Sequence, residues 1–495
     1  MKKERYMLKP SIEESKKYFE EYTVVPVCKE IFADIKTSVE ILKIFMKENK
    51  KCYLLESVDS GENWGRYSFL GFDPKLTVRC NDAAVTVNNG SERKIETNEP
   101  VKVLREILAE YKSPQMEYMP PFTGGLVGYF SYDYVKYVEK SLKLENRNAE
   151  NFDDFYLMLF DKVIAFDHFR QKIFIIANVA VKDFESNYKK AEEDIKNTEA
   201  LIKSCSPDYA VKSGLKSDLR LLHNKDEFGA MVEKIKSHIR EGDIFQAVIS
   251  NGLEADFDGN LFQTYRALRT INPSPYMFFV NFGDVQLAGA SPETLVTLKN
   301  GELKNYALAG TVKRGQNAEE DEALISALLK DEKELSEHNM LVDLGRNDLG
   351  KISEFGSVKV SEYMKILKLS HVSHIASAIT SKMQKGFDGF DAISAVLPAG
   401  TLSGAPKVKA CEIINSLEKH KRGTYGGAIG YIDFAGNMDM CIAIRMAKLQ
   451  NGKVYIQAGA GIVADSVAEK EFQECLNKAQ AVVEAVKTAD AREDI

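Results

Sequence analysis

The amino-acid sequence predicts an α+β fold in which antiparallel-rich sheets are covered by helices. Asn-Gly dipeptides stand between apolar runs at 300–301 and 451–452, and Asn-Gly supplies the two positive φ angles of a type I′ hairpin turn. Such tight turns join antiparallel strands, because parallel strands need a long crossover. Helical periodicity appears between the hairpins, and we expect helices at 225–241, 319–345, 389–397, 403–418 and 466–487. We expect the last helix to begin at a capping box, Ser466-x-x-Glu469.

The first half of the chain has similar strand signals, at 53–58, 75–80, 84–96 and 162–179. A charged amphipathic helix is predicted at 182–205, and the polar stretch 206–218 that follows it reads as a linker. We therefore divide the chain into an N-terminal region, residues 1–205, and a second domain, residues 219–495.

Composition narrows the class of protein. The 495 residues are 44% hydrophobic and 28% charged with a net charge of −7, which excludes wholesale disorder and offers no basic excess for nucleic acid or anionic lipid. No apolar run approaches the roughly 18 residues of a membrane span, and no signal-peptide pattern opens the chain. Seven widely spaced cysteines without a CxxC motif exclude a disulfide scaffold and fit a reducing, cytoplasmic location.

Two glutamate doublets are candidate metal ligands. Glu334 and Glu337 are three residues apart, as are Glu471 and Glu474, and this spacing places each pair on one helix face. Four carboxylates brought together would repel unless a divalent cation neutralised them, and an all-oxygen ligand set favours Mg²⁺ or Mn²⁺ over zinc. Taken singly, each doublet is better explained as solvated helix glutamates.

Glycine- and threonine-bearing turns at 309–311, 400–406 and 459–461 are candidate anion sites, because a backbone without Cβ lets its N–H groups approach a ligand. If the hairpin at 451–452 continues in register, Arg445 lies opposite Ala458 and beside Gly459. An arginine fork beside bare backbone suits a carboxylate. The alternative is ordinary turn glycines and an arginine at a sheet edge.

The histidine pair His371-x-x-His374 does not indicate zinc, because the chain has neither an HExxH motif nor a cysteine partner for the metal. An acid/base role and a structural role for these histidines are equally open. P-loop, GxSxG and Rossmann GxGxxG motifs are also absent from the sequence, so it gives no support to nucleotide hydrolysis, serine hydrolase chemistry or dinucleotide binding. The residues alone therefore indicate an enzyme acting on a small carboxylated substrate.

In order along the chain, these segments resemble the chorismate-utilising enzymes, and in particular their anthranilate-forming branch. The resemblance covers nearly the whole chain and rests on motifs that include NPSPYMFF (272–279), GASPET (289–294), ALAGT (307–311), AGTLSGAPK (399–407), GTYGGAIGY (423–431) and EKEFQECLNKA (469–479). It implies the layered sandwich of that family. It also implies magnesium-dependent amination of chorismate with ammonia and elimination of pyruvate to give anthranilate, the first committed step of tryptophan biosynthesis.

The resemblance also assigns roles to residues at matching positions. Glu337 and Glu474 would bind Mg²⁺, with Glu334 and Glu471 as supporting carboxylates. Glu293 would be the general acid that protonates the departing 4-hydroxyl, and His374 would serve the later pyruvate elimination. Substrate contacts fall on Gly310, Thr311, Thr401, Tyr425, Arg445, Gly459, Ala460 and Gly461, with Arg445 pairing the enolpyruvyl carboxylate.

Two absent lysines separate branches of the family. Relatives that add water carry a lysine base where this chain has Gln246, and relatives resembling aminodeoxychorismate synthase carry a lysine where it has Ala309. The chain therefore resembles the synthases that use ammonia directly. Three alternatives stay open: an aminodeoxyisochorismate synthase that stops before elimination, an aminodeoxychorismate synthase, and an inactive tryptophan-binding regulatory subunit. The family's usual proline is replaced by Ala307.

The resemblance extends to a feedback site and to a partner. Glu56 and Ser57 in LLES, together with Pro275, Tyr276 and Met277 in NPSPYM, match the tryptophan-binding positions, although a buried strand and an ordinary turn would explain both motifs. The sequence has no GxCxG-type nucleophile, so ammonia would come from solution or from a glutamine amidotransferase subunit. The family's usual assembly is a heterotetramer of two large and two small subunits.

Overall fold

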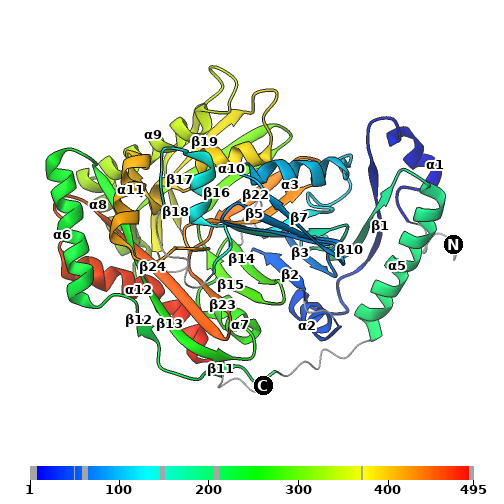
Figure 1. Ribbon diagram of the computed structural model, residues 1–495, viewed down its shortest axis with the longest axis horizontal. Helices are drawn as coiled ribbons and strands as arrows, with labels where there is room; N and C mark the ends of the chain where they lie inside the picture. Colours follow the sequence, from blue (N-terminus) through cyan, green and yellow to red (C-terminus); the bar gives the residue numbers. More distant parts are fainter. Residues whose placement is uncertain are drawn as a thin grey trace.

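The computed structural model describes residues 8–48, 51–57, 65–144, 151–204, 211–368 and 372–489 of the chain. Its strands form two large sheets, and every strand pair within this part of the chain is antiparallel. Helices cover the outer surfaces of the sheets (Figure 1). The predicted α+β class with antiparallel sheets is therefore confirmed.

Counted over the described residues, the first sheet has 13 strands. Its order is β1 (Val24–Phe32), β10 (Lys172–Ala180), β9 (Lys162–Asp167), β3 (Tyr67–Phe72), β2 (Cys52–Glu56), β14 (Tyr276–Asn281), β15 (Val285–Ser291), β23 (Met446–Gln450), β24 (Lys453–Ile462), β13 (Gln246–Asp258) and β11 (Gly214–Leu215). Two short strands, β12 (Arg220–Leu221) and β20 (Gly404–Ala405), also pair with β13.

The second sheet has 11 strands in the part of the chain that the structure describes. Their order is β18 (Lys359–Lys368), β19 (Val372–Lys382), β17 (Glu302–Lys313), β16 (Thr294–Lys299), β22 (Met438–Ile442), β21 (Ala428–Asp433), β7 (Gly125–Phe130), β8 (Phe155–Phe160), β4 (Leu76–Asn81), β5 (Ala84–Asn88) and β6 (Glu92–Glu96).

The helices pack on these sheets: α12 (Ala468–Lys487) contacts β24, α6 (Lys225–Glu241) and α7 (Phe262–Ile271), α9 (Glu332–Gly350) contacts β17, and α11 (Lys407–Leu417) contacts β13. The other helices of the described ranges are α1 (Ile12–Ser15), α2 (Ser38–Glu48), α3 (Pro100–Ala109), α4 (Val135–Val138), α5 (Phe184–Ser204), α8 (Ala318–Leu328) and α10 (Gly389–Val396). Short 3₁₀ turns are η2 (Lys16–Tyr18), η3 (Tyr132–Tyr134) and η4 (Gly400–Leu402). Among the described residues, no helix is long and apolar enough to cross a membrane.

Both sheets combine strands from the two predicted regions. β2 of the N-terminal region pairs with β14, and β7 pairs with β21. One buried cluster likewise extends from Leu8 to Val486. The helix predicted at 182–205 is present as α5, and the domain boundary after it stays a prediction. Residues 206–210 of the predicted linker lie outside the described residues.

The predicted hairpins are confirmed. Asn300 and Gly301 have φ angles of 53° and 79°, and Asn451 and Gly452 have 54° and 71°, as a type I′ turn requires. The second hairpin keeps its predicted register only as far as the pair Ala447–Ile456. The expected pairing of Arg445 with Ala458 is therefore wrong: the arginine lies just before the first residue of β23 with φ at 53°, and Ala458 pairs with Asn251 of β13.

Three helix boundaries differ from the prediction. The segment 319–345 is two helices, because the Asp331 side chain accepts backbone N–H bonds and starts α9 as a separate N-cap. Helix α11 begins at Lys407, after Pro406, since the preceding residues form η4 and β20. The capping box at Ser466 is wrong: α12 begins at Ala468, and the Ser466 hydroxyl accepts the N–H of Val463.

Candidate active site

The two glutamate doublets lie on α9 and α12, and the folded chain brings them together. Burial raises the pKa of Glu334, and the negative charges of Glu337 and Glu474 raise it further. Burial likewise raises the pKa of Glu471, with Glu474 adding to the increase and a hydrogen bond from Ser466 opposing it. Carboxylates from both helices therefore repel one another across a shared space, as the doublet hypothesis requires.

These four carboxylates are not in mutual ligand contact. In the described ranges, only His238, Glu241 and Asp243 place three candidate ligand atoms within 4.8 Å of one another, and that group lies at the end of α6, where it is mostly exposed. The glutamates of α9 and α12 thus line a shared space, and their carboxylate oxygens are not gathered around one point.

Gln246, the first residue of β13, joins this space to the glycine segment of β24. Its Nε2 donates to Oε1 of Glu337 at 3.4 Å, and its own Oε1 is buried without a hydrogen-bond partner. A Cβ at Gly461 would lie 2.6 Å from the same Nε2, so this glycine is needed for the glutamine to reach the carboxylate. The unpartnered oxygen is a hard donor beside the carboxylates.

Lys478 of α12 is a site residue that the sequence analysis missed. Its Nζ lies 2.6 Å from Oε1 of Glu474 and donates to the Gly459 carbonyl oxygen at 3.1 Å. Its own carbonyl accepts Nη1 of Arg445 at 3.0 Å, and its charge lowers the pKa of Glu293. The spacing Glu474–Lys478, i to i+4 on one helix face, was the available signal.

Glu293 follows the end of β15 and pairs with the 400–402 turn. The Thr401 hydroxyl donates to Glu293 Oε1 at 3.0 Å, and the Glu293 carbonyl accepts the N–H of Ile442. Burial raises the pKa of Glu293 to about 7, although the Thr401 hydrogen bond and the Lys478 charge oppose the increase. A carboxyl group with such a pKa holds its proton near neutral pH, as a general acid must.

His374 and Thr311 face each other across β19 and β17. The Thr311 hydroxyl and Nδ1 of His374 are 2.9 Å apart. Gly310 has a φ of 73° at a bulge in β17, which favours glycine. Burial lowers the pKa of His374, so the imidazole is neutral near pH 7. The predicted partner His371 lies outside the described residues.

Arg445 and Tyr425 complete this cluster. Burial lowers the pKa of Arg445, while Tyr425 and Glu474 act in the opposite direction. A Cβ at Gly459 would lie 2.7 Å from the Tyr425 hydroxyl, so close packing requires glycine there. Ala460 differs from its neighbours, because its methyl group is fully buried in the core and only its backbone can face a ligand.

A separate cavity of about 180 Å³ contains all five residues of the predicted feedback site. The Ser57 hydroxyl is buried there without a partner, whereas the Glu56 carboxylate is bound by Arg269, Tyr265 and Ser38. An apolar cavity of about 150 Å³ already accommodates a benzene ring. The predicted residues that line it are Glu56, Ser57, Pro275, Tyr276 and Met277.

Asp439 is a second residue that sequence reasoning missed, and it lines the same cavity. Burial raises its pKa to about 6, and the Tyr276 hydroxyl, which donates to Oδ1 at 2.9 Å, opposes the increase. No short motif pointed to this residue, because its neighbours in space come from distant strands.

The fold and this cluster of acid, histidine, arginine and paired carboxylates define a chorismate-utilising enzyme, and the chain belongs to that family: residues 50–484 match the family of chorismate binding enzymes. It is 45% identical over 493 residues to anthranilate synthase component 1 of Acetivibrio thermocellus, covering 98% of this chain and 99% of the relative. It is 39% identical over 483 residues to the component 1 of Bacillus subtilis (strain 168), covering 94% and 93%.

Solved structures agree with the fold. The crystal structure of anthranilate synthase component I from Streptococcus pneumoniae TIGR4 superposes with a TM-score of 0.74 at 36% identity, covering 86% of this chain and 93% of that one. MenF, the menaquinone-specific isochorismate synthase from Escherichia coli, has a TM-score of 0.68 at 18% identity, covering 96% and 98%, which shows a shared fold alone.

Proposed function

We propose that this chain is the large subunit of anthranilate synthase, which converts chorismate and ammonia to anthranilate, pyruvate and water. The observation that carries the proposal is the convergence of Glu293, His374, Arg445 and the carboxylates of α9 and α12 in a chain similar from end to end to component 1 enzymes. An inactive regulatory subunit would not need a carboxyl group tuned to a pKa of about 7.

In the first step, ammonia forms a bond to C2 of chorismate while the C4–O bond breaks. The departing hydroxyl takes the Glu293 proton and leaves as water, and the ammonium group loses a proton to solvent. In the second step, the aminated intermediate loses its C2 proton while the C3–O bond to the enolpyruvyl group breaks, which gives anthranilate, and the released enolpyruvate takes up a proton at its methylene carbon to become pyruvate. His374 is neutral and partly exposed, and it can take a proton at this step.

Chorismate is a dianion, and two cations of the site suit its carboxylates. Arg445 is held by the Lys478 carbonyl, and Lys478 lies between Glu474 and Gly459. We assign Arg445 to the enolpyruvyl carboxylate. The other groups in position to contact the ring or its substituents are Gly310, Thr311, Thr401, Tyr425 and the backbone of 459–461.

We further propose that Glu337 and Glu474 bind Mg²⁺, with Glu334 and Glu471 in support. Three observations fit a hard divalent cation: the all-oxygen donor set, the pKa of Glu334 and Glu471 raised by burial and further by neighbouring carboxylates, and the unpartnered Oε1 of Gln246. When bound, the metal neutralises the ring carboxylate of the substrate.

The choice of ammonia over water rests on Gln246 and Ala309. A carboxamide cannot deprotonate water at neutral pH, whereas free ammonia already has its lone pair. The Gln246 amide is committed to Glu337, which leaves no side-chain base at that position. The other two chorismate-aminating enzymes considered from the sequence are disfavoured by the full-length similarity to component 1.

We also propose that tryptophan binds the cavity at Ser57 and Met277 as a feedback inhibitor. A glutamine amidotransferase, component 2, would supply ammonia. Two large and two small subunits would form a heterotetramer. The free Ser57 hydroxyl and the Asp439 carboxylate are suited to the polar groups of an amino acid. All six cysteines in the described ranges are unpaired and buried, which supports a reducing cytoplasm.

Product analysis tests the proposed function. The isolated chain is incubated with chorismate and Mg²⁺, with and without ammonium salt, at pH about 8, and products are separated by chromatography and detected by fluorescence. We expect anthranilate only when ammonium is present. Isochorismate or salicylate without ammonium, 4-amino-4-deoxychorismate with it, or an aminated product that retains its enolpyruvyl group would each contradict the proposal.

A further inference from the structure

Arg422 is a buried arginine to which the proposed mechanism gives no role. Its side chain is 2% exposed and forms a bidentate pair with Glu418, with Nε to Oε2 at 2.8 Å and Nη2 to Oε1 at 2.6 Å. The same guanidinium donates to two carbonyl oxygens, those of Leu402 and Val248, each at 2.6 Å. A buried ion pair gains little net stability, because desolvation offsets the attraction, so the geometry that it imposes is the more informative property.

The first carbonyl belongs to the turn that contacts the catalytic acid. Leu402 is the last residue of η4, and Thr401 precedes it. The Thr401 hydroxyl donates to the Glu293 carboxylate at 3.0 Å. Arg422 therefore holds the carbonyl of the residue that directly follows Thr401, and a movement of this carbonyl would change the Thr401–Glu293 distance.

The second carbonyl belongs to β13, the strand against which the turn is seated. The N–H of Val248 donates to the Ser403 carbonyl at 2.8 Å, so one residue of the strand is bound both to the turn and to Arg422. Glu418 extends the same support: it accepts the N–H and the hydroxyl of Ser250, at 2.7 and 2.9 Å. Ser250 pairs with Gly459 across the sheet. Two site segments thus share one guanidinium–carboxylate pair.

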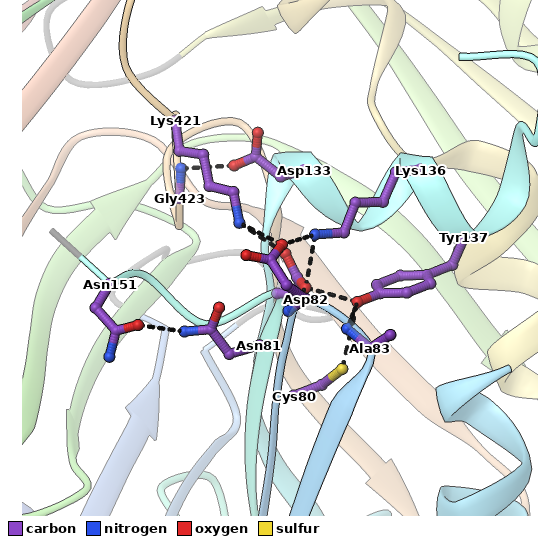
Figure 2. A network of polar contacts seen from close by, with 11 residues as sticks. Cys80, Asn81, Asp82, Ala83, Asp133, Lys136, Tyr137, Asn151, Lys421 and Gly423 are labelled. Atoms are coloured by element: carbon purple, nitrogen blue, oxygen red, sulfur yellow. Dashed lines mark hydrogen bonds and ion pairs between the residues drawn. The ribbon is translucent and has the colours of Figure 1, made fainter. Parts of the chain in front are cut away.

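The residues on either side of this arginine are fastened to the N-terminal region (Figure 2). Lys421 Nζ lies 3.1 Å from Oδ1 of Asp82 and 3.5 Å from Oδ1 of Asp154. The N–H of Gly423 donates to Oδ2 of Asp133 at 2.9 Å. Carboxylates from three separate segments of residues 82–154 therefore fix the backbone from which the guanidinium projects.

We propose that Arg422 is a positioning residue for the catalytic acid: by holding the carbonyls of Leu402 and Val248, it fixes the turn that brings the Thr401 hydroxyl onto Glu293. The inference rests on the proposed function, in which Glu293 donates a proton to the leaving hydroxyl. The N-terminal region contributes indirectly to the position of the turn, because it anchors the segment that carries Arg422.

The proposal has a consequence that a purely structural role would not have. Two groups act on the ionised form of Glu293, the Thr401 hydroxyl from the turn and the Lys478 ammonium from α12, and both lower the pKa of the carboxyl. A lysine in place of Arg422 can still pair with Glu418, but it lacks the planar fork that reaches two carbonyls as well. The turn then relaxes, the Thr401 hydrogen bond weakens, and the pKa of Glu293 rises.

The test compares the parent chain with Thr401→Val, Arg422→Lys and the double variant. The dependence of kcat/KM for chorismate on pH is measured with free ammonia held constant. We expect each single substitution to move the alkaline limb to higher pH by about half to one pH unit, the effect of one hydrogen bond. The double variant should move it no further, because both changes remove one contact. The matched control is Arg105→Lys, which changes a bidentate pair to Asp388 away from the turn and should leave the profile unchanged.

The outcomes separate the two proposals. If Thr401→Val moves the limb and Arg422→Lys does not, or if the two shifts add, Arg422 does not act through the turn and the inference is overturned. If neither substitution moves the limb, the role of Glu293 fails as well. Should Arg422→Lys not fold, Lys421→Met is measured in its place; a smaller shift in the same direction supports the proposal, and an unchanged profile contradicts it.

Discussion

The protonation of Glu293 should govern how turnover depends on pH. With a pKa of about 7 in place of the usual 4.5, about half of the molecules carry the proton at pH 7, about one in ten at pH 8 and about one in a hundred at pH 9. A carboxyl of ordinary pKa would be protonated in only about 0.3% of molecules at pH 7. We therefore expect kcat/KM for chorismate to fall about tenfold per pH unit above pH 7.5 when free ammonia is constant.

The shape of the pH profile depends on whether total ammonium or free ammonia is held constant. At fixed total ammonium, the concentration of free ammonia rises about tenfold per pH unit below the ammonium pKa, while the protonated fraction of Glu293 falls by the same factor above pH 7. The activity should therefore rise with pH up to about 7 and then level off. A continued rise towards the ammonium pKa would mean that the acid keeps its proton well above pH 7, or that no such acid is needed.

The assay follows anthranilate fluorescence from pH 6 to 9 in both ammonia regimes, with saturating Mg²⁺. Glu293→Gln is the matched variant, because it keeps the size of the side chain and cannot donate a carboxyl proton. It should lose at least about 100-fold in kcat, within the usual contribution of a general acid. A flat profile at constant free ammonia, or a Gln variant with parental activity, would refute the reasoning.

The remaining predictions concern the metal, the effector and the packing of the glycine segment. Glu474→Gln should weaken Mg²⁺ binding, measured by calorimetry without substrate, by at least about tenfold, and EDTA should abolish turnover of the parent chain; an unchanged affinity would remove this residue from the metal site. Ser57→Ala should raise the tryptophan concentration needed for half-inhibition by about 3- to 10-fold, because one hydrogen bond is lost, with activity largely spared. Met277→Thr should raise it too, because it shortens an apolar side chain that lines the cavity. If both variants stay as sensitive as the parent, the effector binds elsewhere. Gly459→Ala places a Cβ 2.7 Å from a tyrosine hydroxyl, and should cost about 1–3 kcal/mol of unfolding free energy in urea denaturation as well as weakening chorismate binding. Parental stability and KM would show that the segment can move aside.

Features encoded in adjacent residues were predictable from the sequence. Both Asn-Gly hairpins and the helix at 225–241 depend on local turn chemistry and capping, and the structure has them at the predicted residues. The break before α9 was missed, although Asp331 is a typical N-cap, because apolar periodicity continues through it. Arg445 precedes the first residue of β23 with a φ of 53°, and no turn residue such as glycine or asparagine marks this position in the sequence.

The same distinction between local and long-range signals applies to the residues of the site. The glutamate doublets could be named because each pair lies within one helical turn, and family motifs supplied Glu293 and His374. Contacts between distant segments could not be read from spacing. The Thr401–Glu293 bond joins residues 108 apart in sequence, and Val248–Arg422 joins residues 174 apart. These contacts exist only because the two sheets interleave strands from the whole chain.

The same interleaving connects the cavity proposed for tryptophan to Glu293, the proposed general acid. Strand β14, which carries Tyr276 and Met277, pairs directly with β15, and Glu293 lies two residues after Ser291, the last residue of that strand. The Tyr276 hydroxyl lies 2.9 Å from the hydroxyl of Thr294, the residue after the acid. A ligand that displaces Tyr276 therefore disturbs its hydrogen bond to Thr294, which is the residue next to Glu293. Inhibition requires only that tryptophan bind more tightly to an arrangement in which Glu293 or the turn at Thr401 is misplaced, and by reciprocity chorismate must then weaken tryptophan binding by the same factor.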